Sequence, residues 1–355
     1  MKKILLLSLF LMLSACTSTS DEQSDLHLIN SIQKGDYSML IPFESSPVRA
    51  YHGTYLGRAD FLEVGDRLSE KSKEYYNPDQ YYLAEGQVLD IDQLSALVKR
   101  ESSDNPYGLN PPSGSQFVTG VGDLSILNAV VVADVVELDF YSGASSNPEL
   151  NGLAFAIVLN DQLKDSSDNY VSVTQSRLYE YGSDMGRKLE RYIRTLTNME
   201  SIPVYIALYS TASIDSALPG SFIGDGYFDG RSGQFKENDE QWTLFPSTDA
   251  SSLDPRTDAS FQTFKGNIQN FVPEAIGVIG HAHYVNGDLN KLNLYIHIQA
   301  KTFAEIYALV QYSAQSLNEF AIEGYDIIVK IESVSDTLAM IERQSDGTLS
   351  VIMSE

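Results

Sequence analysis

The chain has 355 residues and a formal net charge of −24, from 48 acidic and 24 basic side chains. This acidity argues against nucleic acid and anionic lipid headgroups as partners, because both would repel the chain. The length predicts about two domains. Since 43% of the residues are apolar and 10% are aromatic, the sequence can build folded cores.

The N-terminus has the composition of a secretory signal. Two lysines near the start precede an apolar run from Ile4 to Leu13, and small residues follow before Cys16. The run is too short for a transmembrane helix, which needs roughly 20 apolar residues. We therefore expect residues 1–15 to be a signal peptide that is removed.

Residues 13–16, Leu-Ser-Ala-Cys, fit the bacterial lipobox, and Cys16 is the only cysteine in the chain. In a lipobox the thiol takes a diacylglyceryl thioether, with acyl chains such as palmitate, and a dedicated peptidase cleaves between Ala15 and Cys16. Two acyl chains hold a protein on a membrane. We expect Cys16 to anchor the chain to the outer face of the cytoplasmic membrane after lipoprotein-processing enzymes have acted. Cleavage by the ordinary signal peptidase, with Cys16 as a bystander, is the alternative.

The anchored cysteine and a tether precede the first folded elements. Residues 16–35 begin with a stretch that has no apolar side chain from Thr17 to Asp25, which predicts a flexible tether. Two helices are then expected over Ala59–Tyr76 and Ile91–Lys99, and Asp90 is the expected N-cap of the second.

Four tyrosines stand in the segment "YYNPDQYYLAEGQVLD", residues 75–90. A tyrosine-rich surface can bind peptides or sugars through ring stacking and hydroxyl contacts. The alternative is a turn whose tyrosines cap the core with their hydroxyls in water, and the sequence favours that alternative.

A buried strand, an amphipathic helix and a second strand follow in the first domain. The strands are expected over Gly152–Asn160 and Pro203–Ser210, and the helix carries an apolar stripe from Leu178 to Tyr192. The later segment "GDGYFDGRSG", residues 224–233, contains two aspartates but lacks the spacing of an EF-hand. It therefore predicts a tight turn between strands.

A polar segment with one proline, Asp249 to Ser260, predicts the boundary between a first domain over residues 36–250 and a second over residues 262–355. In the second domain, Gly277–Val285 and Lys291–Ala300 flank "NGDLN", which predicts a hairpin. A helix and three strands are expected to complete this domain, over Phe303–Leu317, Tyr325–Ile331, Thr337–Arg343 and Thr348–Met353.

The order strand, helix, strand occurs in both halves of the sequence. It predicts an α+β fold with two related repeats, each a mainly antiparallel sheet packed with helices. Because hairpin signals outnumber β-α-β alternations, a doubly wound parallel sheet is not expected.

Three of the five histidines fall in the predicted hairpin of the second domain. His281 and His283 are two residues apart and so share a strand face, and His297 lies on the partner strand with the same parity. Three imidazoles could hold zinc or another divalent ion, with a carboxylate or water as the fourth ligand. The alternative is a polar face that is solvated or packs on the first domain.

The sequence contains no G-x-S-x-G, Walker or H-E-x-x-H motif, and it has no cysteine beyond Cys16. We therefore expect no enzyme activity and no cofactor. A metal-dependent hydrolase that uses the three histidines is the enzymatic alternative.

Several segments together resemble the CamS sex-pheromone lipoprotein family. They are the lipobox, "YYNPDQYYLAEGQVLD", "NPYGLNP" at 105–111, "LNGLAFAIVLN" at 150–160 and "IPVYIALYSTASIDSALPGSFIGDGYF" at 202–228, and "ALPGSFIGDGYF" is the most specific of them. The resemblance runs roughly from Val48 to the C-terminus. It implies a two-repeat α+β lipoprotein of Gram-positive bacteria.

The resemblance also implies that the end of the signal peptide is a product in its own right. In such precursors a short hydrophobic peptide, released at the lipobox and trimmed by a membrane protease, induces conjugative plasmid transfer. On this chain the peptide would be Leu9-Phe10-Leu11-Met12-Leu13-Ser14-Ala15.

The mature domains would bind an unidentified peptide or protein ligand. A solute- or peptide-binding lipoprotein, with tyrosines lining a cleft between the domains, is the alternative.

Overall fold

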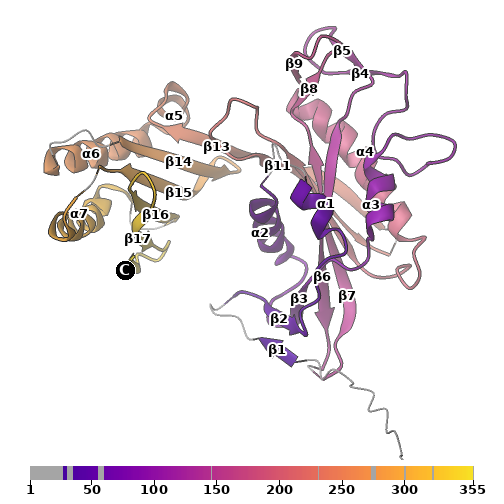
Figure 1. The fold of residues 1–355 in the computed structure, drawn as a ribbon, viewed down its shortest axis with the longest axis horizontal. Helices are drawn as coiled ribbons and strands as arrows, with labels where there is room; N and C mark the ends of the chain where they lie inside the picture. Colours follow the sequence, from indigo (N-terminus) through magenta and orange to yellow (C-terminus); the bar gives the residue numbers. More distant parts are fainter. Residues whose placement is uncertain are drawn as a thin grey trace, which may run out of the picture.

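The computed structural model describes residues 27–29, 35–54, 60–144, 146–230, 232–272, 277–299, 301–321 and 324–354. Within these ranges the chain forms two large sheets, one in each of two domains that lie side by side (Figure 1). The predicted signal peptide, lipobox and tether before residue 27 lie outside the described residues.

The first domain is built on an eight-stranded sheet with the order β1-β2-β3-β6-β7-β10-β11-β12. Neighbouring strands are antiparallel except β2 with β3 and β7 with β10, which are parallel. The strands are β1 His27–Ile29, β2 Ser38–Ile41, β3 Tyr81–Glu85, β6 Val132–Ser142, β7 Glu149–Leu159, β10 Val204–Ser210, β11 Ser221–Asp229 and β12 Ser232–Glu237. Two small hairpins lie at one end of the domain, β4 Gln116–Val118 with β5 Ser125–Leu127 and β8 Gln162–Lys164 with β9 Tyr170–Ser172.

Helices cover both faces of this sheet, and each face has its own apolar core. The helices are α1 Arg49–Thr54, α2 Phe61–Ser72, α3 Ile91–Val98 and α4 Gln175–Ile193. Helix α2 contributes Val64 and Leu68 to one core, whereas α3 and α4 contribute to the core on the opposite face. The predicted helices near residues 61–72 and 91–98 are thus present, and Asp90 caps α3 in a full capping box.

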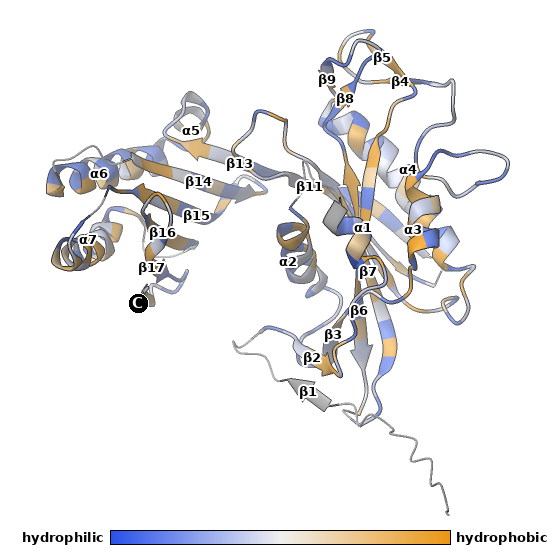
Figure 2. Ribbon diagram, viewed as in Figure 1, coloured by the Kyte–Doolittle hydropathy of each residue, from blue (hydrophilic) through white to orange (hydrophobic). Residues whose placement is uncertain are grey.

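The second domain is built on a six-stranded sheet with the order β13-β14-β15-β16-β17-β18. Only β15 and β16 pair in parallel. The strands are β13 Glu240–Phe245, β14 Gly277–Val285, β15 Asp288–His297, β16 Asp326–Glu332, β17 Thr337–Arg343 and β18 Leu349–Met353. Its helices are α5 Thr248–Leu253, α6 Pro255–Phe271 and α7 Phe303–Ser316, followed by a short 3-10 turn Leu317–Glu319. Buried and exposed positions alternate along β15, whereas the central strand β7 is hydrophobic and buried from Leu153 to Leu159, and the helices carry both hydrophobic and hydrophilic residues (Figure 2).

The two sheets share one connectivity. In the first sheet, the successive pairings are antiparallel, antiparallel, parallel, antiparallel and antiparallel across the strands β3, β6, β7, β10, β11 and β12. The six strands β13 to β18 of the second sheet pair in the same order of directions. In each half a single helix, α4 or α7, connects the parallel pair. The predicted α+β class is therefore confirmed. The shared connectivity is what two related repeats require, while the duplication itself stays a prediction.

The predicted domain boundary lies too far along the chain: the first domain ends at Asn238 instead of residue 250, and the second begins at Asp239 instead of residue 262. The backbone N–H of Asn238 donates to Ile223 in the first sheet, whereas the carbonyl of Asp239 accepts from Asn286 in the second. The polar segment 249–260 forms α5 and the first turns of α6 instead of a linker. Its serines, aspartates and proline are cap and exposed-face residues, because Asp254 caps α6 and a proline is favourable in the first turn.

The glycine- and aspartate-rich segment 224–233 also differs from the prediction. Residues up to Asp229 continue β11, and the chain turns only at Gly230, whose φ of +58° favours glycine. The strand that follows is β12 of the first sheet, which the sequence analysis missed. Asp225, one of the two aspartates of this segment, lies buried within β11 and is therefore not a turn residue.

No helix of the described ranges combines the length and apolar character needed to cross a bilayer.

Replacing Phe264 by alanine tests whether α6 belongs to the core of the second domain. Phe264 on α6 is fully buried in the core of the second domain, so its truncation should cost about 3–5 kcal/mol of that domain's stability. Phe303 on α7 is 74% exposed, and its alanine variant should stay within about 0.5 kcal/mol of wild type. Chemical denaturation followed by fluorescence measures both. Equal stability of the two variants would show that α6 does not belong to this core.

Candidate functional site

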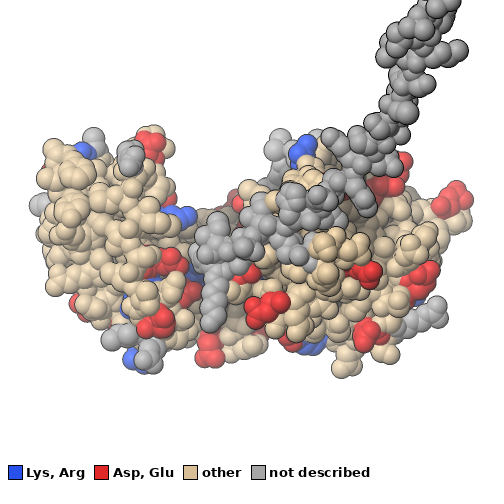
Figure 3. Space-filling view, turned by 90° about the horizontal axis from the view of Figure 1, so that it is seen from below, with Lys and Arg blue, Asp and Glu red and all other residues tan. Residues whose placement is uncertain are grey.

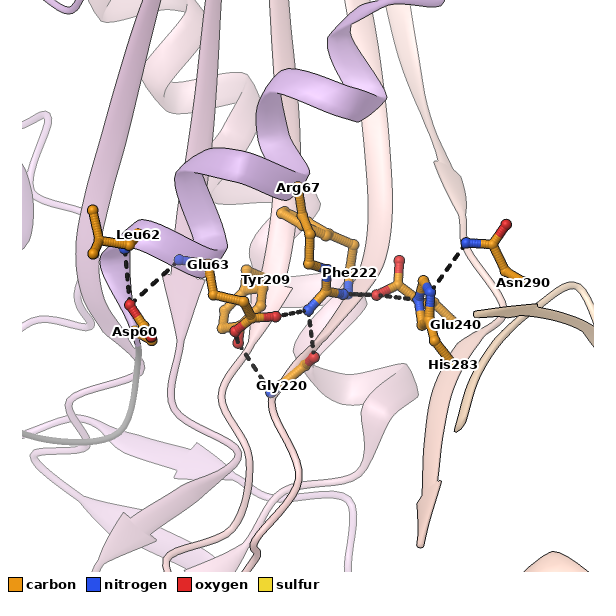
Figure 4. Close-up of polar contacts among 10 residues, drawn as sticks. All are labelled: Asp60, Leu62, Glu63, Arg67, Tyr209, Gly220, Phe222, Glu240, His283 and Asn290. Atoms are coloured by element: carbon orange, nitrogen blue, oxygen red, sulfur yellow. Dashed lines mark hydrogen bonds and ion pairs between the residues drawn. The ribbon is translucent and has the colours of Figure 1, made fainter. Parts of the chain in front are cut away.

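A polar cluster lies where the two domains meet (Figure 4). Its centre is Arg67, which projects from α2 of the first domain. Its guanidinium forms ion pairs with Glu63, one helical turn earlier, and with Glu240 at the start of β13. It also donates a hydrogen bond of 3.0 Å to the carbonyl of Gly220. Arg67 therefore connects three separate segments of the chain across the domain junction.

Glu240 is contacted by residues of both domains. Its side chain is 4% exposed. Besides Arg67, its Oε1 accepts a hydrogen bond of 3.2 Å from the backbone N–H of Phe222 and lies 3.3 Å from Nε2 of His283 on β14. A buried carboxylate is costly unless it is paired and hydrogen-bonded, and Glu240 meets both conditions.

Aromatic rings surround the Arg67 guanidinium. Its central carbon lies 5.7 Å, 5.1 Å and 5.6 Å from the ring centroids of Tyr209, Phe222 and Trp242. Trp242 in turn stacks on His283, with ring centroids 4.6 Å apart. Rings at these distances attract a cation and exclude water from it. The ion pair with Glu240 is therefore poorly screened and strong.

His283 is held in its neutral form. Burial, followed by the nearby positive charges of Arg67 and Lys71, lowers the pKa of His283 to about 4. Its Nδ1 lies 3.3 Å from the side-chain amide nitrogen of Asn290, so Nδ1 accepts and Nε2 carries the proton. That N–H lies 3.3 Å from Oε1 of Glu240 but does not have the geometry of a hydrogen bond, so the buried Nε2 has no hydrogen-bond partner among the described residues.

A pocket of about 310 Å³ adjoins this cluster. Trp242 and Gln241 of β13 form one wall, and the segment from Ser210 to Ser221 supplies hydroxyl groups and the apolar Leu218. Asp161, whose carboxylate accepts from the Thr211 hydroxyl at 3.0 Å, also lines it. None of the described lining residues is a tyrosine, so the tyrosine-lined cleft of the alternative prediction is not found here.

The predicted tyrosine segment packs inside the first domain. Tyr76 is buried, and its hydroxyl donates to the carbonyls of Leu153 and Pro203 at 2.9 Å and 3.0 Å. Tyr75 stacks on Tyr227 with ring centroids 4.3 Å apart. Tyr75 and Tyr76 therefore pack in the core, as the alternative prediction expected, but the Tyr76 hydroxyl is buried and hydrogen-bonded instead of lying in water.

The three predicted metal-binding histidines do not meet. The strand register places them on one sheet face, with His283 opposite Lys291, His281 opposite Asn293 and His297 opposite Gly277. His283 belongs to the domain junction, His281 packs against Tyr295, and His297 lies 3.5 Å from Glu332. Across the described ranges, no three His, Cys, Asp or Glu side chains gather closely enough to hold a metal ion.

The sequence matches the model of the family described as "CamS sex pheromone cAM373 precursor" over residues 43–348. The chain belongs to the CamS family. The crystal structure of a sex pheromone precursor from Lactobacillus salivarius subsp. salivarius UCC118 superposes with a TM-score of 0.78 at 22% identity, covering 92% of this chain and 98% of that one. The C-terminal domain of the sex pheromone staph-cAM373 precursor from Staphylococcus aureus gives 0.67 at 21% identity, covering 83% and 96%. No curated protein sequence matches this one.

In this CamS chain the segment "ALPGSFIGDGYF" builds the junction. Gly220 supplies the carbonyl that Arg67 binds, and Phe222 supplies both the N–H that Glu240 accepts and a ring below the guanidinium. A Cβ on Gly220 would lie 2.2 Å from the carbonyl oxygen of Ser210, so only glycine fits there. Sequence analysis singled out this segment but not Arg67 or Glu240, which carry no local pattern.

Removing the Arg67 side chain should weaken the junction. Arg67→Ala leaves Glu240 buried without its main partner, which should cost about 3 kcal/mol or more. Arg67→Lys keeps the charge but loses the planar fork, and should fall between the alanine variant and wild type. Denaturant melts measure stability, and energy transfer between one dye on each domain measures their relative orientation.

The double variant Arg67→Met, Glu240→Gln is the matched control. It removes both charges at once, so it should be more stable than Arg67→Ala. If Arg67→Ala keeps both the stability and the interdomain distance distribution of wild type, this cluster does not fix the domain arrangement.

Proposed function

We propose that this CamS chain is a lipoprotein anchored to the outer face of the cytoplasmic membrane by a diacylglyceryl group on Cys16. The observation that carries this proposal is the lipobox Leu13-Ser14-Ala15-Cys16, which follows an apolar signal and contains the only cysteine of the chain. Family membership, over residues 43–348, supports it.

The tether limits how far the folded body stands from the membrane. From Cys16 to the first described strand at His27, an extended chain spans at most about 40 Å. Acidic side chains are spread over the face seen in Figure 3, with few basic ones between them. An anionic membrane surface repels such a body, so the lipid anchor supplies the attachment and the body faces outward.

We further propose that the signal peptide is the source of the pheromone. Release at the lipobox and trimming by a membrane protease would give Leu9-Phe10-Leu11-Met12-Leu13-Ser14-Ala15. The family description, a sex pheromone precursor, supports this role. The peptide has no charged side chain, so it can cross or enter a cell envelope more easily than a charged peptide can.

The mature domains are proposed to bind a peptide or protein ligand rather than to catalyse a reaction. The pocket of about 310 Å³ beside the domain junction favours binding, because hydroxyl groups, Asp161 and Trp242 converge on it from two domains. A ligand in that pocket would contact both domains at once, and its affinity would depend on their arrangement.

Replacing Cys16 tests the anchor. The wild-type chain should incorporate labelled palmitate and enter the detergent phase on Triton X-114 partition, whereas Cys16→Ser should do neither. Ser14→Ala, which keeps small residues before the cysteine, is the matched control and should behave as wild type. A wild-type chain that is unlabelled and released into the medium with Cys16 at its N-terminus contradicts the proposal.

The peptide itself tests the pheromone. Synthetic Leu-Phe-Leu-Met-Leu-Ser-Ala should raise plasmid transfer from a donor that carries a pheromone-responsive plasmid, measured as transconjugants per donor. A scrambled peptide of the same composition is the control, because it preserves hydrophobicity and removes sequence recognition. Equal transfer with both peptides across responsive donors would refute the role.

A further inference from the structure

A pocket lined by arginines lies at the C-terminal end of α4, in a chain whose net charge is −24. The pocket has a volume of about 540 Å³. One wall is α4, while β11 and β12 contribute Phe228 and Gly233, and the segment after α3 contributes Tyr107. The pocket beside the domain junction is lined by Gln175 and Leu178 at the opposite end of α4, so the two pockets are separate.

Arg194, at the end of α4, holds the shape of this wall and has no donor left for a ligand. Its Nε donates to Glu190 at 2.9 Å. Its two Nη atoms donate to four backbone carbonyls, those of Met199, Ile202, Phe228 and Gly230. All five N–H groups of the guanidinium are therefore used. The charges of Arg194 and Glu190 also cancel within the wall.

Arg187 and Arg191 supply the uncompensated charge of the pocket. The other cations of α4 and its C-cap are all paired: Arg177 with Glu180, Lys188 with Glu101 and Arg194 with Glu190. Arg187 and Arg191 are exposed, and neither forms an ion pair with an acid of the described residues. Two positive charges with free N–H groups thus face one pocket of a strongly acidic chain.

Helix stability accounts for only one of these two arginines. Cations favour the C-terminal end of a helix because of its dipole, but the effect is confined to the last turn. Arg191 lies in that turn and Arg187 does not. Like charges four residues apart slightly destabilise a helix. An anion bound between the two guanidinium groups would remove this repulsion.

We propose that the pocket binds a small organic phosphate, with the phosphate group between the guanidinium groups of Arg187 and Arg191. The N–H fork of a guanidinium matches the geometry of phosphate oxygens. Two arginines also balance a phosphomonoester, which carries roughly 1.5 to 2 negative charges at pH 7. Tyr107 and Phe228 offer ring surface to the organic part. At Gly233 a Cβ would lie 2.4 Å from the Phe228 ring, so this wall carries no side chain.

The charge of the whole chain favours a small phosphate over a polyanion. The acidic body repels nucleic acid, whose phosphates extend beyond the pocket. Salt screens charges over about 8 Å at physiological ionic strength, so a single phosphate in contact with two arginines is governed mainly by them. This site goes beyond the peptide or protein ligand proposed at the domain junction, and its failure would leave that proposal intact.

Calorimetry with the purified full-length protein tests the site, using phenyl phosphate as the probe. Phenol is the neutral control and should bind at least about tenfold more weakly, because the charge-assisted hydrogen bonds are lost. Phenyl sulfate carries the same ring and a single negative charge, so its affinity should fall between the other two.

Variants of the two arginines should lower the affinity for phenyl phosphate. Arg187→Gln and Arg191→Gln should each weaken it about fivefold to tenfold, and the double variant should bind it no better than phenol. Arg187→Lys keeps the charge but loses the fork, and should fall between Arg187→Gln and wild type. Arg256→Gln, an exposed arginine on α6, removes the same charge elsewhere and should stay within about twofold. Thermal melts should show that every variant is folded as wild type.

The pH dependence gives a test without variants. None of the described lining residues is a histidine or a cysteine, and arginine stays charged. A phosphomonoester gains its second negative charge near pH 6, so affinity for phenyl phosphate should increase between about pH 5 and pH 7.5 while that for phenyl sulfate stays constant. The proposal is overturned if phenyl phosphate binds no better than phenol, binds the double variant as tightly as wild type, or binds equally well at both pH values. Arg187 and Arg191 would then be a solvated helix face.

Discussion

The ion pair of Arg67 with Glu240 is the interaction on which the two-domain arrangement depends. Each domain has its own apolar core, and no apolar core of the described residues spans both. The junction is instead polar and buried, with a guanidinium, a backbone N–H and a neighbouring imidazole around one carboxylate. Buried pairs of this kind add little net stability, because desolvation offsets their attraction. They do penalise any arrangement that separates them, so they favour one orientation over others.

The backbone around this pair is shaped to serve it. Gly220 must lie against the carbonyl of Ser210, and this contact aims its own carbonyl at Arg67. Two residues later Phe222 turns its N–H towards Glu240 while its ring lies below the guanidinium. One short segment thus presents a carbonyl and an aromatic ring to the positive Arg67 and an N–H to the negative Glu240. These contacts require the particular residues of the segment.

Local pattern predicted the elements well, because period and capping are local. The alternation of β15, the position of α7 and the cap at Asp90 all appear as expected. The domain boundary was predicted at the wrong position because the polar residues on the exposed sides of α5 and α6 have the same composition as a linker. The three histidines share a sheet face but do not converge, because the odd or even position of a residue in a strand fixes its sheet face and not its distance from other side chains on that face. Arg67 with Glu240, and Glu137 with Asp139, depend on tertiary contacts far apart in sequence.

Two buried acidic sites differ in how completely they are satisfied. Glu240 has a cation, a neutral imidazole and a backbone donor around one carboxylate, all from the chain itself. Asp139 accepts from one backbone N–H and shares a side-chain hydrogen bond with Glu137. A buried carboxylate without a counter-charge either takes up a proton or recruits a cation from outside. The chain closes the first site with its own residues, which suits a fixed joint. It closes the second with backbone N–H groups and a hydrogen bond between two acids, where burial raises the pKa of both carboxyl groups.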